Sequence, residues 1–270
     1  MTVYDELAMA IRGEEPAALA TVIDGPGCGA KLLVQPGRPA HGTLQDPDLD
    51  RVVARDALGE LAAGRTVVRH YGPHGEARED TVTVFVETFA PPPAMLVFGA
   101  VDFTAALVRV AKVLGYRVTV CDAREVFATA KRFPQADEVV VDWPDRLLDR
   151  VGPALTRRDA VCVLTHDAKF DVPALVGALA TDAGYIGAMG SRRTHADRAR
   201  RLREHGVDAR GLARIRAPIG LDIGARTPEE TAVAICAEII ADRTGRPQAR
   251  PLSSLDGPIH QATTPTTGGA

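Results

Sequence analysis

The chain has 270 residues, of which 46% are hydrophobic and 25% are charged, and its formal net charge is −3. This composition is typical of a globular protein, and it gives no electrostatic reason to bind nucleic acid or a membrane surface. The N-terminal residues lack the apolar core of a signal peptide, and no run approaches the ~18 apolar residues of a membrane span. None of the four cysteines forms a C-x-x-C pair, so we expect a cytoplasmic protein without a zinc ribbon or a disulfide framework.

The first third of the chain predicts a small α/β domain over residues 1–90. Helical spacing is found in "DELAMAIRG" and in "LDRVVARDALGELAAG", whereas "AALATVI", "AKLLVQPG" and the alternating "DTVTVFVETF" predict strands. The three prolines at 91–93 cannot continue a helix or a central strand. We therefore expect a short linker at 91–93.

Strands and helices alternate after the prolines. The strands are predicted in "AMLVFG", "YRVTVC", "ADEVVVD", "DAVCVLT" and "GYIGAM", with helices between and after them, the last being "PEETAVAICAEIIADRTG". Apolar runs of this kind suit parallel strands that are covered on both faces. We predict a Rossmann-like doubly wound parallel sheet over 94–245 and a flexible tail over 246–270.

Ligands of such sheets bind outside the carboxyl ends of the strands. The first strand ends in "FGAVDFTAAL", where Gly99 is present but the other two glycines of a dinucleotide fingerprint are missing, and where Asp102 opens the helix. The second strand ends at Asp122, at the place where an acid binds the ribose hydroxyls of an adenosine. A tight strand–helix turn at Gly99 and a loop cap at Asp122 stay open as the structural alternatives.

The fourth strand ends in "LTHDAKFD", which brings Thr165, His166 and Asp167 to the ligand edge. Neighbouring residues of an extended segment point in opposite directions, so a catalytic dyad of His166 and Asp167 is not expected. Loop hydrogen bonding is the alternative role for them, and Asp171 is expected to cap the following helix. Asp222 lies between two glycines of a loop that either closes over the crevice or is a structural connection.

The fifth strand leads into "GSRR", in which Gly190 precedes Ser191, the expected N-cap of a helix. Arg192 and Arg193 follow, although cations are disfavoured at the positive end of a helix. The arrangement makes sense if an anion binds there, because helix N-termini and arginine forks both suit phosphate. The alternative is that both arginines are solvated or paired with acids such as Asp182 or Asp197.

Four segments together resemble the XdhC/CoxI family, the accessory proteins of xanthine dehydrogenase and related molybdenum hydroxylases. They are "FGAVDFTAALVRVAKVLGYRVTVCDAR", "VCVLTHDAKFDVPAL", "YIGAMGSRRTHADRARRL" and "IGLDIGARTPEETAVAICAEII", and "LATVIDGPGCGAKLLVQPG" is similar to the N-terminal domain of that family. The resemblance implies binding of molybdenum cofactor, a pterin bearing phosphate that is sometimes a dinucleotide. It also implies help with the terminal sulfuration of this cofactor and its delivery to a hydroxylase apo-enzyme. Homodimer formation is left open.

The sequence departs from the family pattern in three segments. The "GGCVE" segment of the family corresponds to "QDPDLD", where Asp48 replaces the cysteine, and "DGPGCGAK" lacks the Ser-x-Pro-Arg element. Val101 and Asp102 stand where many relatives carry Gly and His. Two other functions therefore stay open: an NAD(P)-dependent oxidoreductase, suggested by Asp122, and a nucleotide-sensing scaffold protein.

Overall fold

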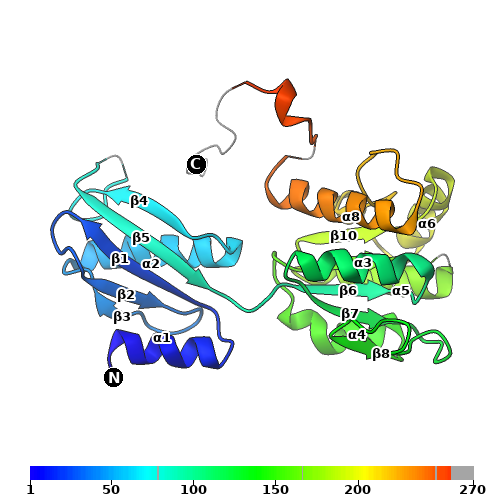
Figure 1. Ribbon diagram of the computed structural model, residues 1–270, viewed down its shortest axis with the longest axis horizontal. Coiled ribbons are helices and arrows are strands. Elements are labelled where there is room, and N and C mark those ends of the chain that lie inside the picture. The colour runs from blue at the N-terminus through cyan, green and yellow to red at the C-terminus, as the bar shows by residue number, and fades with distance from the viewer. Residues whose placement is uncertain (78, 166, 247, 257–270) are drawn as a thin grey trace.

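The computed structural model describes residues 1–77, 79–165, 167–246 and 248–256 (Figure 1). It is an α/β structure in which an antiparallel sheet with two helices is followed by a Rossmann-like, doubly wound parallel sheet. This confirms the predicted fold class. Within the described ranges, none of the helices combines the length and the apolar character that crossing a membrane requires.

The antiparallel sheet has the strand order β3-β2-β1-β5-β4. Its elements are α1 (Val3–Arg12), β1 (Ala17–Asp24), β2 (Lys31–Val34), β3 (His41–Thr43), α2 (Pro47–Ala63), β4 (Val67–Tyr71) and β5 (Val82–Phe89). Side chains of β1 alternate between two cores: Ala18 and Ala20 pack with α2, whereas Ala17 and Leu19 pack with α1. The period of two along β1 thus covers each face of the sheet with one helix.

The helix α2 begins in the segment that departs from the family pattern. Asp46 is its N-cap and accepts hydrogen bonds from the amides of Asp48 and Leu49, and Pro47 occupies the first turn. Both residue types are favoured at these positions. The segment is therefore well suited to start a helix, and Asp48 is exposed in its first turn.

The parallel sheet has the strand order β11-β10-β9-β6-β7-β8. Its strands are β6 (Ala94–Phe98), β7 (Arg117–Cys121), β8 (Glu138–Val140), β9 (Ala160–Val163), β10 (Tyr185–Ala188) and β11 (Ile215–Arg216). The chain winds outward from β6 in one direction and then from β9 in the other, so the switch point lies between these two strands. The two-residue strand β11 was not predicted.

Helices cover both faces of the parallel sheet (Figure 1). They are α3 (Asp102–Val113), α4 (Pro144–Val151), α5 (Ala168–Leu179), α6 (Arg192–Glu204), α7 (Ala209–Ala213) and α8 (Pro228–Arg243). On β6, Met95 and Val97 pack in the core with α3 and α8, whereas Leu96 and Phe98 pack in the core with α4, α5 and α6. This two-sided burial is the reason for the unbroken apolar runs in the sequence.

Candidate functional site

The turn after β6 is packed against the chain that follows β9. Gly99 has a φ of +115°, and a Cβ added there would lie 2.6 Å from Cγ2 and 3.1 Å from the amide nitrogen of Thr165. Only glycine permits both this backbone conformation and this approach. The geometry gives Gly99 the role of a tight turn at the switch point, which is the structural alternative considered above.

The helix α3 opens with an acid. Its N-cap Val101 has no side-chain hydrogen bond, and Asp102 in its first turn is exposed, with one carboxylate oxygen 3.7 Å from Arg132. In dinucleotide-binding folds the amides at this helix end face the diphosphate. A carboxylate at this position repels a diphosphate, and this argues against NAD(P) binding here.

Asp122 is buried, and its carboxylate is fully engaged by neighbouring donors. One oxygen accepts from the amide of Ala100 at 2.9 Å and from Arg124 Nη2 at 2.8 Å; the other accepts from the Arg124 amide and Nε at 3.0 and 2.9 Å. Burial by itself raises the pKa of Asp122, but the hydrogen bonds from Arg124 and Ala100 outweigh it and leave the pKa lowered. A ribose would have to displace these donors, so the geometry matches a loop cap.

The N-cap of α5 is Asp167, whose carboxylate accepts from the Lys169 amide at 3.0 Å. The prediction that Asp171 caps this helix is therefore wrong, because the helix begins one turn earlier than "DVPALV" indicates. Asp171 lies instead inside the first turns of α5 and is 3% exposed. The predicted candidate His166 lies outside the described residues.

Asp171 is the centre of a buried polar network between β9, β10 and α6. It accepts a hydrogen bond from Thr165 Oγ1 and an ion pair from Arg198, whose Nη2 lies 2.7 Å from Asp171 Oδ2. The same Nη2 donates to the carbonyl of Met189 at 2.8 Å. The network thus ties the ends of two parallel strands to α6, and it includes Thr165 from the sequence prediction.

The helix α6 begins as predicted, with Ser191 as its N-cap. The Thr194 amide donates to Ser191 Oγ at 3.1 Å, and Gly190 before the cap has a φ of +142°. Arg192 and Arg193 are exposed and form no hydrogen bond or ion pair with any residue that the structure describes. Within those ranges, nearby acids do not neutralise them, so the structure leaves two free guanidinium groups beside the helix end.

Sequence reasoning missed two residues of α6 that lie beneath this end. Arg198 is 3% exposed, yet its Nη1 has no hydrogen-bond partner among the described residues, and the same is true of buried His195 Nδ1. Burial, followed by the charge of Arg198, lowers the pKa of His195. A signal existed in the sequence, because the helical period places His195 and Arg198 on the same face as the apolar residues Ala199 and Leu202.

Asp222 is exposed and has no hydrogen bond or ion pair to the described residues. Two hydrogen bonds to α8 hold its loop in place. The Gly220 amide donates to Glu238 at 2.8 Å, and the Leu221 amide donates to the carbonyl of Ala234 at 3.1 Å. No described contact brings Asp222 to the start of α6.

Family models match both parts of the chain. Residues 95–239 match the XdhC Rossmann domain, and residues 10–72 match the model of the XdhC and CoxI family. The chain belongs to the XdhC and CoxI family.

Several relatives resemble this XdhC and CoxI family chain. A protein of Bacillus subtilis described as a probable xanthine dehydrogenase subunit is 32% identical over 179 residues, which is 66% of this chain and 51% of that protein. The uncharacterized protein YqeB of Escherichia coli is 26% identical over 258 residues, 92% of this chain and 47% of that protein. The molybdenum cofactor insertion chaperone PaoD of Escherichia coli is 37% identical over 84 residues, 31% of this chain and 26% of that protein. The chain therefore spans about half the length of the first two relatives.

A crystal structure described as a xanthine dehydrogenase from Bacillus halodurans has the same fold. The TM-score is 0.51 at 22% identity, with 94% of this chain and 99% of that chain covered. At this identity the likeness concerns the fold alone.

The cysteines of this family member do not form a metal centre. Cys121, Cys162 and Cys236 are buried, and burial raises the pKa of Cys121 to about 12. Cys28 is exposed, and its thiol lies 3.5 Å from the carbonyl of Ile23. Over the described ranges, no three side chains of His, Cys, Asp or Glu gather in a way that could hold a metal ion.

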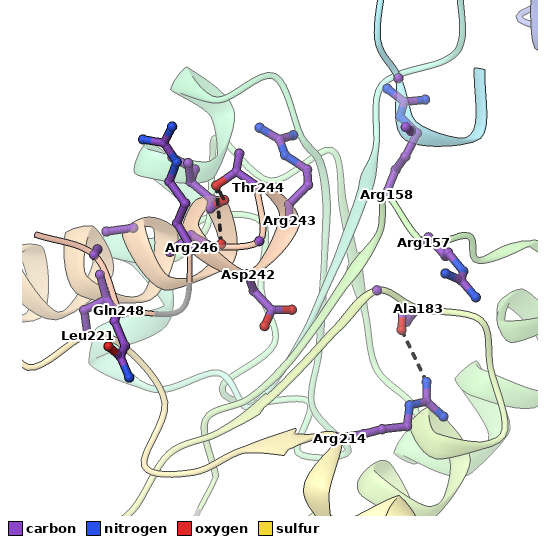
Figure 2. A pocket seen from close by; sticks show the side chains of 18 of the residues that line it. Arg157, Arg158, Ala183, Arg214, Leu221, Asp242, Arg243, Thr244, Arg246 and Gln248 are labelled. Atoms are coloured by element: carbon purple, nitrogen blue, oxygen red, sulfur yellow. Dashed lines mark hydrogen bonds between the residues drawn. The ribbon is translucent and has the colours of Figure 1, made fainter. Parts of the chain in front are cut away.

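A large cleft lies at the other, amino edge of the parallel sheet (Figure 2). Its volume of about 2480 Å³ is more than twice the upper end of the ~300–1,000 Å³ range of small-molecule sites. Arginines and aspartates line it: Arg65, Arg157, Arg158, Arg210, Arg214, Arg243, Arg246 and Arg250, with Asp182, Asp208, Asp242 and Asp256. None of the described candidate residues lies in this lining, so the cleft is separate from the site at α6.

Proposed function

We propose that this chain is an accessory protein of a xanthine dehydrogenase-type molybdenum hydroxylase, which binds molybdenum cofactor and passes it to the apo-enzyme. Membership of the XdhC and CoxI family supports the accessory role. The likeness to a chaperone that inserts molybdenum cofactor supports the nature of the cargo. The three buried cysteines and exposed Cys28, all free, agree with a cytoplasmic setting, where thiols stay reduced.

The start of α6 is the observation that carries this proposal. Ser191 and Gly190 present an open helix end, and Arg192 and Arg193 beside it have no counter-charge among the described residues. A phosphate completes such a site, because it accepts from both the helix amides and the guanidinium groups. The phosphate of a pterin cofactor has this chemistry.

We assign structural roles, rather than ligand contacts, to most of the other candidate residues at the carboxyl edge of the parallel sheet. Gly99 and Asp167 form a turn and a helix cap, Asp122 is engaged by Arg124, and Asp102 and Asp222 are exposed acids. Thr165 belongs with the anion site, because its hydroxyl orients Asp171. No observation favours an NAD(P)-dependent reaction.

The test is cofactor retention and transfer. The chain is produced in cells with and without cofactor synthesis, and the purified protein is mixed with a cofactor-free hydroxylase. We expect retained cofactor and activation of the hydroxylase, and both are lost when Arg192 and Arg193 are replaced by alanine. Replacement of Arg200, which pairs with Glu204 farther along α6, is the matched control and leaves both intact. A wild-type chain that neither retains the cofactor nor activates the hydroxylase contradicts the proposal.

A further inference from the structure

We propose that the buried nitrogens of Arg198 and His195 form a subsite at the start of α6 that receives the terminal oxygens of a phosphate monoester. The inference deepens the proposed function, on which it rests for the identity of the natural ligand. It concerns two residues that neither the family resemblance nor the sequence motifs single out.

The first argument is the unpaired nitrogen of Arg198. Its side chain is 4% exposed. Its Nε and Nη2 lie 3.3 and 2.7 Å from one oxygen of Asp171, and Nη2 also donates to the Met189 carbonyl. Nη1 is buried with no partner among the described residues. A guanidinium carries five N–H donors, and leaving buried donors unpaired is unfavourable, so Nη1 points to an acceptor that comes from outside the chain.

The second argument is the direction of the side chain. Side chains of a helix tilt toward its N-terminus, so Arg198 in the second turn reaches back toward the first. A Cβ added to Gly190 would lie 3.7 Å from Arg198 Nη2 and 3.0 Å from Thr194 Cγ2. The guanidinium therefore lies close to Gly190, the residue before the N-cap of α6.

The third argument is a second unpaired atom on the same helix face. His195 precedes Arg198 by three residues, which places the two side chains next to each other. Its Nδ1 is buried without a partner in the described part of the chain. In the tautomer with a proton on Nδ1, the imidazole donates a hydrogen bond there. Two adjacent donors without acceptors indicate one polar guest that accepts from both.

The unpaired nitrogens of the subsite favour one class of ligand. Asp171 and the Met189 carbonyl occupy Nε and Nη2 of Arg198, so Nη1 is the nitrogen left for a ligand at the helix end. A terminal phosphate has three free oxygens and about two negative charges near neutral pH, and it can extend into the subsite. A diphosphate within a dinucleotide is substituted on both sides and has no free end. The subsite therefore favours the cofactor form with a terminal phosphate over the dinucleotide form.

The experiment compares methyl phosphate with dimethyl phosphate on the full chain. Calorimetry gives the affinities, and NMR follows the Arg198 guanidinium and the His195 ring. We expect the monoester to bind and to shift both signals, and the diester to bind at least about tenfold more weakly and leave them unshifted. Arg198→Lys keeps the charge opposite Asp171 but removes Nη1, and it weakens monoester binding about tenfold, the loss of one charge-assisted hydrogen bond. Arg201→Ala, on the exposed side of the same helix, leaves the affinity unchanged.

A second pair of variants covers the case in which Arg198→Lys does not fold. Asparagine places an N–H close to the position of His195 Nδ1, whereas leucine fills the space without a donor. His195→Asn should retain monoester binding, and His195→Leu should weaken it severalfold. Equal affinity for both esters with unshifted His195 and Arg198 signals would mean that an internal water fills the subsite, and this overturns the inference. This experiment uses no hydroxylase, so such a result would not contradict the accessory role, which is tested separately by cofactor retention and hydroxylase activation.

Discussion

The buried ion pair between Asp171 and Arg198 makes a strong prediction about single residues. Replacing Asp171 with Asn leaves the Arg198 charge buried without a counter-charge, and such changes cost about 3–5 kcal/mol of unfolding free energy. Urea denaturation measures this loss. The double variant Asp171→Leu with Arg198→Met should recover most of it, because it removes both buried charges. Asp197→Asn, at an exposed position of α6, should change the unfolding free energy by less than about 0.5 kcal/mol. A similar cost for both single variants would contradict the role given to the pair.

Asp122 makes a prediction about acid stability. Its pKa in the folded chain is below the ordinary value of 3.8, despite burial, because Arg124 and the Ala100 amide donate to it. The unfolded state therefore takes up this proton first as the pH falls. The contribution of Asp122 is fully present above the ordinary pKa and is lost as the pH falls through the lowered one.

Urea midpoints measured at pH 7 and pH 3 test this for the wild type and for Asp122→Asn. We expect the wild type to lose more stability between the two pH values than the variant does. An equal loss in both proteins would show that the hydrogen bonds to Asp122 do not favour its charged form.

At the scale of elements, the turn after β6 is fixed by its contact with the chain after β9. Gly99→Ala meets both an unfavourable φ and the Thr165 side chain 2.6 Å away, and should cost about 1–3 kcal/mol or more. Gly115→Ala is the matched control, since Gly115 has a φ of +80° with no atom near its Cβ position. It should lose only the conformational part, about 1–2 kcal/mol. Thermal unfolding measures both, and equal losses would rule out a steric contribution from Thr165.

The end of α5 depends on a side chain from another element. Arg214 donates to the carbonyls of Leu179, Thr181 and Ala183, the last bond being visible in Figure 2. Arg214→Ala should lower the unfolding free energy by about 1–2 kcal/mol, because the last carbonyl of α5 and two carbonyls of the segment after it lose their charged donor. Arg210→Ala, in the helix α7 that ends just before Arg214 and without a described partner, should be nearly neutral. Equal thermal midpoints for the two variants would contradict the capping role.

The sequence predicted the helices and strands that are determined by residues close together in the chain. Ser191 begins α6 as predicted, and α8 begins at a capping box of Thr227 and Glu230, because caps depend on residues three or four apart. The apolar runs predicted the parallel strands for a similar reason. The start of α5 was misplaced because two acids, Asp167 and Asp171, both suit a cap, and only the tertiary pairing with Arg198 separates them.

The helical period places Arg198 on the buried face of α6, but its pairing with Asp171 was beyond sequence reasoning. Arg198 lies 27 residues from Asp171 along the chain, and arginines are rarely buried without a partner. The fold alone brings the two together. The short strand β11 was missed for a related reason, because its two residues carry no period and are fixed by pairing with β10.

For the whole molecule, the geometry predicts that the Rossmann fold does not bind NAD or NADP. Asp102 stands where a diphosphate would bind, and Asp122 is occupied by Arg124. Titration of the full chain with either nucleotide, followed by fluorescence of the single tryptophan and by calorimetry, should give no saturable binding up to millimolar concentration. Saturable binding that Asp122→Ala abolishes would contradict this and would restore the oxidoreductase hypothesis.

The two arginines at the start of α6 also bear on how the proposed anion would be released. Two cations beside a positive helix end destabilise the chain without a bound anion, by roughly 0.3–1 kcal/mol for each charge. A bound anion removes this unfavourable repulsion. Salt screens its attraction to the exposed arginines beyond about 8 Å at physiological ionic strength. Occupancy of the exposed arginines by an anion is therefore an ion-exchange equilibrium. Under the proposed function, a receiving protein that binds the anion more tightly would take it up by mass action, without a hinge motion or nucleotide hydrolysis in this chain.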